Sequence, residues 1–127
     1  MKKVELLSPA GSMEALYAAI HNGADAIYLG GKSFGARATA TFSNEELIEA
    51  INYAHLYDVK IYVTINTLIY DDEIEELLLY VDFLYKNDVD AIIVQDLGVL
   101  DLIRKTYPDL EIHASTQMHI YNADSLK

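Results

Sequence analysis

Two cations, Lys32 and Arg37, follow a pair of glycines in a chain that has few positive charges. The chain contains nine Lys and Arg residues against twenty Asp and Glu residues, which gives a formal net charge of −11. Gly30 and Gly31 come directly after a short apolar stretch, and glycine lets the backbone approach a ligand closely. We therefore expect a close-approach loop at the end of a strand, where the two cations bind a small anionic ligand. The alternative is an ordinary glycine-rich connection with two solvated charges.

A second group of polar residues falls at or just past the ends of other predicted strands. Barrel enzymes place their substrate contacts at the carboxyl ends of the strands, and amide side chains can both donate and accept hydrogen bonds there. Asp96 also has the position of a helix N-cap, which is its simpler interpretation. The predicted substrate-binding residues of this group are Asn66, Gln95, Asp96, His113, Ser115 and Gln117.

Several kinds of chemistry are excluded or disfavoured for this chain. It has no cysteine, so it offers no disulfide, no thiolate ligand and no cysteine nucleophile. His113 and His119 lack a suitably spaced carboxylate or thiolate, so we predict no metal site. No serine lies in a nucleophile elbow. The acidic charge argues against binding nucleic acid through bulk electrostatics, because phosphate binding needs clustered cations.

The sequence predicts neither a membrane span nor a secretory signal. A span needs a run of about 18 apolar residues, and no such run exists. The apolar stretch near the amino end is short and is interrupted by Glu5, unlike a signal peptide. Because the lack of cysteine is compatible with a reducing compartment, we expect a cytoplasmic protein.

Five short apolar segments alternate with amphipathic segments. We predict strands at 4–7, 26–29, 59–65, 91–94 and 111–115. Helices are predicted from an N-cap at Ser12 to about residue 22, from an N-cap at Ser43, over 72–86 and over 97–106. Glu46 completes a capping box with Ser43, and Gly23 suits the position after a helix end. We find no sequence duplication and no linker, and we therefore treat residues 1–127 as a single partial domain.

The alternation within the predicted strands selects between two architectures. One set of positions is apolar, as in Ile61, Val63 and Ile65, whereas the set between them is mixed and polar, as in Tyr62 and Thr64. An open sheet covered on both faces favours strands that are apolar throughout. We therefore predict the first half, about five strands, of a (βα)8 TIM-type barrel, with a flavodoxin-like open sheet as the alternative. Unpaired edge strands in such a half-barrel predict self-association.

Four blocks of the sequence carry a family resemblance. They are Glu5-Leu-Leu-Ser-Pro-Ala-Gly-Ser12, Gly23-Ala-Asp-Ala-Ile-Tyr-Leu-Gly-Gly31, Ile93-Val-Gln-Asp-Leu-Gly98 and Glu111-Ile-His-Ala-Ser-Thr-Gln-Met118. In this order they resemble the amino-terminal part of peptidase family U32, the collagenase-like peptidases. The resemblance implies a barrel-type catalytic domain that continues beyond Lys127.

The resemblance implies several activities for a full-length protein. Some family members act in hydroxylation of a tRNA uridine or an rRNA cytidine, and the family name implies a collagenase-like protease. Several members carry an iron–sulfur cluster on cysteines of a later signature that this chain lacks. We expect RNA base hydroxylation, with a peptidase as the alternative and an RNA or a protein as the substrate. A third possibility is that the segment alone is a non-catalytic folding or interaction module; by itself we expect it to be inactive.

Overall fold

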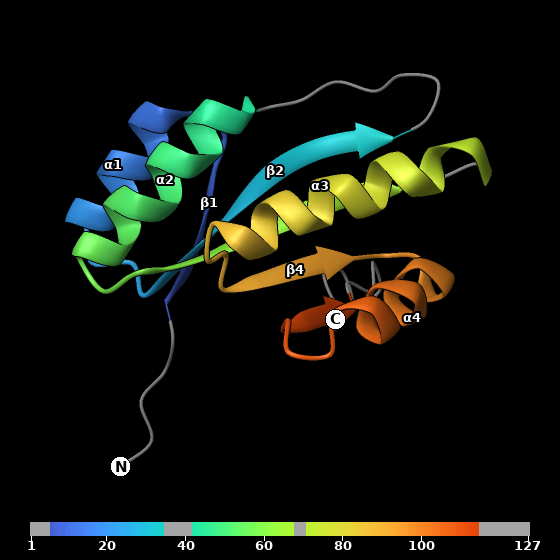
Figure 1. Cartoon of the computed structure of the whole chain (residues 1–127). Coiled ribbons are helices and arrows are strands. Elements are labelled where there is room, and N and C mark those ends of the chain that lie inside the picture. The colour runs from blue at the N-terminus through green and yellow to red at the C-terminus, as the bar shows by residue number, and fades with distance from the viewer. Residues whose placement is uncertain (1–5, 35–41, 68–70, 115–127) are drawn as a thin grey trace, which may run out of the picture.

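A computed structural model shows five strands alternating with four α-helices (Figure 1). It describes residues 6–34, 42–67 and 71–114, without the side chains of 31–34, 66, 67 and 71. The strands are β1 (Leu7–Ala10), β2 (Ala26–Phe34), β3 (Lys60–Thr67), β4 (Ala91–Val94) and β5 (Ile112–Ala114). The helices are α1 (Met13–His21), α2 (Asn44–Leu56), α3 (Ile74–Lys86) and α4 (Leu97–Thr106), and a 3-10 turn, Asp71–Glu73, precedes α3.

The predicted helix caps are confirmed. The Ser12 hydroxyl accepts a hydrogen bond from the Ala15 amide, which begins α1. Ser43 and Glu46 form the predicted capping box at the start of α2, with both hydrogen bonds present. Gly23 has a φ of 95°, the left-handed conformation expected directly after a helix end. These local signals place the helix boundaries without help from tertiary contacts.

Two predicted strands are wrong in position or length. The first strand is Leu7–Ala10, whereas we expected residues 4–7, and Leu6 is 51% exposed although its predicted position faced the helices. This strand contains Pro9, which an edge strand tolerates because one side of its backbone needs no partner. β2 continues to Phe34, so Gly30 and Gly31 lie in a strand and the predicted loop is wrong. The pairing of β2 with β3 shifts register between Gly30 and Ser33, as at a β-bulge. The strand therefore continues past the two glycines with an irregularity in its pairing.

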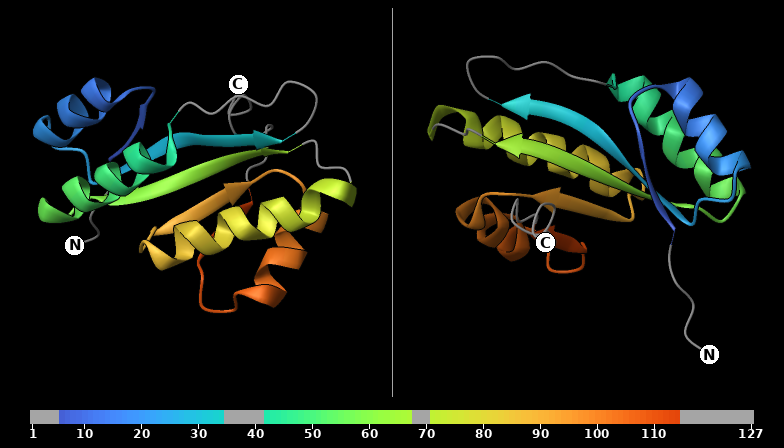
Figure 2. Two further views of the ribbon diagram at one scale, coloured as in Figure 1. Left: turned by 45° about the horizontal axis from the view of Figure 1, so that its top comes forward. Right: turned by 180° about the vertical axis from the view of Figure 1, so that it is seen from behind.

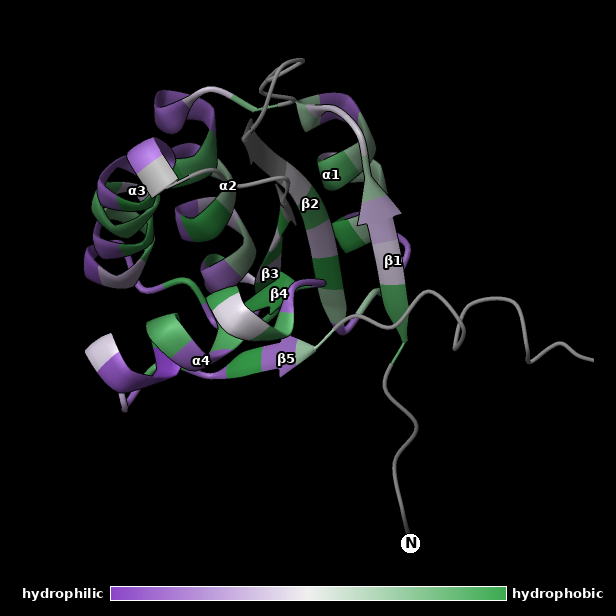
Figure 3. Ribbon diagram, turned by 90° about the vertical axis from the view of Figure 1, so that its right-hand side faces the viewer, coloured by the Kyte–Doolittle hydropathy of each residue, from purple (hydrophilic) through white to green (hydrophobic). Residues whose placement is uncertain are grey.

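The strands form one parallel sheet in the order β1-β2-β3-β4-β5. A flavodoxin-like sheet has its first strand between the second and the third, so the observed order excludes the alternative. Sequential order of parallel strands is what the first half of a βα barrel requires. Figure 3 shows the sheet curving from β1 to β5, with α2, α3 and α4 along its outer side. The structure is consistent with the predicted half-barrel.

The four helices pack on one face of the sheet, and in the views of Figure 2 no described helix lies on the other, uncovered face. The main core joins the alternating apolar strand residues to the buried residues of all four helices. Ile27, Ile61 and Ile92 belong to it and have no exposed surface. The predicted division of the strands into two faces is confirmed for these positions. The second face holds a small separate cluster around Tyr62, with Ala26 and Ala91.

The first three helices end in the same backbone motif. The residue after each C-cap has positive φ: Gly23 at 95°, Asp58 at 62° and Asp88 at 65°. The next residue then donates its amide to a carbonyl five positions back, as Val59 does to Ala54 and Val89 to Leu84. This arrangement is a Schellman motif, which satisfies the last carbonyls of a helix. It turns the chain directly from helix into the next strand.

An aspartate repeats in two of these junctions. Asp25 precedes β2 and accepts the Leu6 amide at 2.8 Å, whereas Asp90 precedes β4 and accepts the Ile61 amide at 2.7 Å. Each aspartate also donates its own amide to the carbonyl of that same residue. The blocks Asn22-Gly-Ala-Asp-Ala-Ile27 and Asn87-Asp-Val-Asp-Ala-Ile92 are therefore equivalent. The two junctions thus share a short sequence pattern and the same backbone contacts.

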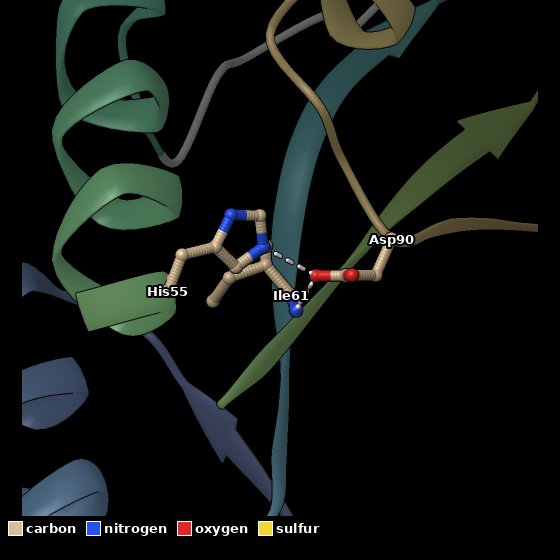
Figure 4. A network of polar contacts seen from close by, with 3 residues as sticks. All are labelled: His55, Ile61 and Asp90. Carbon is tan, nitrogen blue, oxygen red and sulfur yellow. Dashed lines mark hydrogen bonds and ion pairs between the residues drawn. The ribbon is translucent and has the colours of Figure 1, made fainter. Parts of the chain in front are cut away.

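Asp90 also contacts a histidine of the helix layer. The His55 Nε2 atom, near the end of α2, lies 2.7 Å from the same Asp90 oxygen (Figure 4). One carboxylate thus connects the end of α2, the start of β3 and the entry to β4. Such a connection fixes the register of two neighbouring strands relative to a helix of the outer layer.

The two outer strands of the described sheet, β1 and β5, each pair with one neighbour only. The predicted self-association through these edges stays a prediction. Among the described helices, none combines the length and apolar character needed to cross a membrane.

We predict that Asp90→Ala lowers the free energy of unfolding by about 1–3 kcal/mol, because it leaves the Ile61 amide without its acceptor. Asp90→Asn should cost less, since the amide oxygen can still accept that bond. Urea unfolding followed by circular dichroism gives both values. The control is Asp101→Ala, which removes only an exposed helix pair with Lys105 and should change stability by less than about 0.5 kcal/mol. Equal effects of Asp90→Ala and Asp101→Ala would contradict the proposed connection.

Candidate functional site

The uncovered face of the sheet carries two rows of side chains. Residues paired across parallel strands point to the same face, so the strand register defines each row. The lower row is Pro9, Tyr28, Tyr62 and Ala91. The upper row, nearer the carboxyl ends of the strands, is Gly30, Thr64, Ile93 and His113. The upper row of this face is the candidate site, because barrel-type enzymes take their catalytic residues from the carboxyl ends of the strands.

Tyr62 and His113 contact each other although they lie on strands that are not neighbours. Their ring centroids are 5.5 Å apart and the rings are tilted by 53°. The strand between them, β4, presents Ala91 beside Tyr62. Because the Ala91 side chain is a single methyl group, the two rings can meet over it. Tyr62 is 7% exposed and His113 is half-buried, so the histidine is the accessible member of the pair.

A carboxylate holds the His113 ring. Glu111 directly precedes β5, and its Oε2 atom lies 2.6 Å from Nε2 of His113, two residues further along the chain. A carboxylate only accepts hydrogen bonds, so Nε2 carries the proton. In the neutral imidazole, Nδ1 is then an acceptor. His113 is thus oriented by two contacts, Glu111 on its edge and Tyr62 on its ring.

The structure brings together only part of the predicted site. Thr64, in the same row as His113, donates its hydroxyl hydrogen to the Leu29 carbonyl at 3.0 Å and holds β3 to β2. Gln95 is exposed at the end of β4. The Asp96 carboxylate accepts the amides of Gly98 and Val99, at 2.7 and 3.1 Å, and caps α4. The structure thus gives Asp96 the role of a helix cap.

The remaining predicted residues are described in part or not at all. Lys32 and Asn66 lie within β2 and β3, but their side chains fall outside the described residues. Arg37, Ser115 and Gln117 lie outside the described ranges altogether. The anion site and the amide contacts therefore stay predictions.

A depression of about 750 Å³ lies at the opposite, amino-terminal end of the sheet. Its lining includes His55, Asp90, Asp109 and Glu111, next to the starts of β4 and β5. Sequence reasoning did not single out His55 or Asp90; the repeated aspartate before a strand was the available signal. Because Asp90 binds the Ile61 backbone, we interpret this pair as structural. The amino-terminal end of a barrel-type sheet usually serves stability.

Among the described residues, the groups whose pKa is shifted lie in the helix layer, away from the candidate site. Hydrogen bonds from Lys86 and Tyr107 lower the pKa of Asp82, which links α3 to the end of α4. A hydrogen bond to Glu49 raises the pKa of Tyr17, and one with Tyr57 raises that of Tyr53. These contacts join one helix to the next or successive turns of one helix. We assign them to helix packing.

The sequence model described as peptidase family U32 matches residues 11–127. The chain belongs to peptidase family U32. This match agrees with the resemblance seen in the four sequence blocks, and it includes the strand that carries His113.

Curated relatives within this family have different names. The chain is 45% identical over 98% of its length to "23S rRNA 5-hydroxycytidine C2501 synthase" of Escherichia coli, covering 19% of that protein. It is 39% identical over 96% of its length to "tRNA hydroxylation protein P" of Helicobacter pylori, covering 29% of that protein. It is 36% identical over 97% of its length to "Collagenase" of Porphyromonas gingivalis, covering 30% of that protein. The chain thus spans 19% to 30% of the length of these family U32 relatives.

The residues of this chain do not fit an iron–sulfur cluster, which the family U32 resemblance implied for full-length members. Such clusters are held by cysteine thiolates, and the chain has none. Among the described residues, no three His, Asp or Glu side chains gather in a way that could hold a metal ion.

The Glu111 contact predicts the tautomer of His113. In the neutral ring the proton should reside on Nε2, because Oε2 of Glu111 can only accept. Long-range ¹⁵N NMR of the histidine ring reports this directly. Glu111→Gln should weaken the preference, since an amide can donate as well as accept, whereas Glu14→Gln on α1 should leave it unchanged. A neutral His113 protonated on Nδ1 in the wild-type chain would refute the arrangement.

Proposed function

We propose that the protein to which this chain belongs acts in hydroxylation of a tRNA or rRNA base. The observation that carries the proposal is the 45% identity, over 98% of the chain, to a relative named as an rRNA 5-hydroxycytidine synthase. Relatives named as tRNA hydroxylation proteins match over nearly the same range. Because the chain spans a minor share of each relative, the proposal concerns the whole protein.

In this proposal the chain supplies some of the residues that bind the substrate. His113, Gln95, Asn66 and Gln117 orient the base, and Lys32 with Arg37 binds an anionic group of the substrate or of a small co-substrate. The residues that break and form bonds, with any iron–sulfur cluster, lie in the rest of the protein. The chain has no cysteine to bind such a group.

A peptidase is the second candidate. It is supported by the 36% identity over 97% of the chain to a relative named as a collagenase. The described residues contribute no metal-binding cluster to such an activity. A peptidase would therefore depend on a nucleophile or metal set outside the described residues.

We predict that loss of the gene removes a hydroxylated pyrimidine nucleoside from tRNA or rRNA. Total nucleoside digests of each purified RNA, analysed by mass spectrometry, measure this. Complementation with the full-length Arg37→Ala variant should restore the nucleoside only in part, because the anion site has lost one cation. Arg104→Ala, which removes an exposed cation on α4, should restore it fully.

Two results would count against these assignments. Unchanged hydroxylated nucleosides after gene loss, together with chelator-sensitive cleavage of collagen by the purified full-length protein, would favour the peptidase. Full restoration by Arg37→Ala would remove Arg37 from the site and leave the hydroxylation itself untouched.

A further inference from the structure

We propose that the partly exposed His113 ring is a stacking surface for an unpaired pyrimidine base, with Tyr62 as its support. The inference rests on the proposed function and specifies how its substrate is held. It depends on the placement, orientation and charge of three described residues: Tyr62, Glu111 and His113.

His113 lies where a ligand could reach it. His113 projects from the face of the sheet that the helices leave uncovered, in the row nearer the carboxyl ends of the strands. Its side chain is 42% exposed, whereas Tyr62 behind it is 7% exposed. The Tyr62 ring is therefore packed, whereas the His113 ring can be reached. In the same row, Gly30 adds no side chain that would crowd a planar ligand.

The orientation of the His113 ring is fixed by its neighbours. A stacking platform binds more tightly when its ring is already fixed in the bound orientation, because less freedom is lost on binding. Glu111 fixes the His113 ring by a hydrogen bond to Nε2 at 2.6 Å, and Tyr62 contacts the ring at a centroid distance of 5.5 Å. Tyr62 belongs to β3, and Glu111 directly precedes β5.

The surface beside the His113 ring carries a negative charge. Glu111, next to His113, is a carboxylate and would repel a phosphate group, so the surface suits the neutral base better than the RNA backbone. Base stacking tolerates such an environment, since every base has a π-face. Phosphate contacts would then come from cations elsewhere in the protein.

The test uses the full-length protein and two single-stranded pyrimidine oligonucleotides, one intact and one with a single abasic position at the centre. Fluorescence anisotropy gives the ratio of their affinities. We expect the wild type to prefer the intact strand by about tenfold. His113→Leu should lose most of this preference, whereas His113→Phe, which keeps an aromatic ring, should retain most of it.

The matched control is His21→Leu. His21 also lies beside tyrosine rings, Tyr53 and Tyr57, but on α1 in the helix layer, so its loss should leave the preference unchanged. Circular dichroism and the melting temperature verify that each variant is folded. A wild type without preference for the intact strand, or His113→Leu with an undiminished preference, would overturn the inference.

The outcome is separable from that of the proposed function. If His113→Leu loses the preference while gene loss leaves all RNA nucleosides unchanged, base stacking stands and hydroxylation fails. If gene loss removes a hydroxylated nucleoside while His113→Leu keeps both the preference and the nucleoside, hydroxylation stands and the stacking surface fails.

Discussion

The structure depends on burial of one face of a parallel sheet against four helices. Each strand contributes alternate apolar side chains to this layer, and residues such as Ile27, Ile61 and Ile92 are fully buried in it. Because side chains alternate across a strand, this burial also decides which residues face the other way. Tyr62, Thr64 and His113 reach the uncovered face for that reason. The position of the candidate site is thus a consequence of hydrophobic packing on the opposite side.

Burial alone does not determine the register of one strand relative to the next. The turns that lead from a helix into the next strand help to define it. An aspartate precedes each of β2 and β4, and it binds one residue through both its side chain and its backbone amide. Asp25 binds the backbone of Leu6 in this way, and Asp90 binds that of Ile61; we call this pair of contacts a clamp. The clamp defines the register at the start of each strand, and the register aligns Thr64, Ile93 and His113 in one row. The two ends of the sheet therefore have separate tasks, alignment at the amino end and exposed chemistry at the carboxyl end.

The sequence predicts features that are set locally. Helix caps at Ser12 and Ser43, and the two faces of β3, follow from neighbouring residues alone. Features that depend on distant partners were missed or misplaced. β1 lies at 7–10 because its pairing with β2 selects those residues, and the clamp of Asp90 on Ile61 joins positions 29 residues apart. The contact between Tyr62 and His113 needed the sheet order and the small Ala91 between them, neither of which a single strand reveals.

The charge of the chain constrains how such a face could serve RNA. With a net charge of −11, the segment cannot supply the counterion release that drives most backbone binding. An aromatic platform beside a carboxylate is suited instead to selecting one exposed base after the RNA has been held elsewhere. Affinity and selection would then belong to different parts of the protein. On this view, removing acidic residues from the outer helices would strengthen RNA binding without changing which base is chosen, because the two properties depend on separate surfaces.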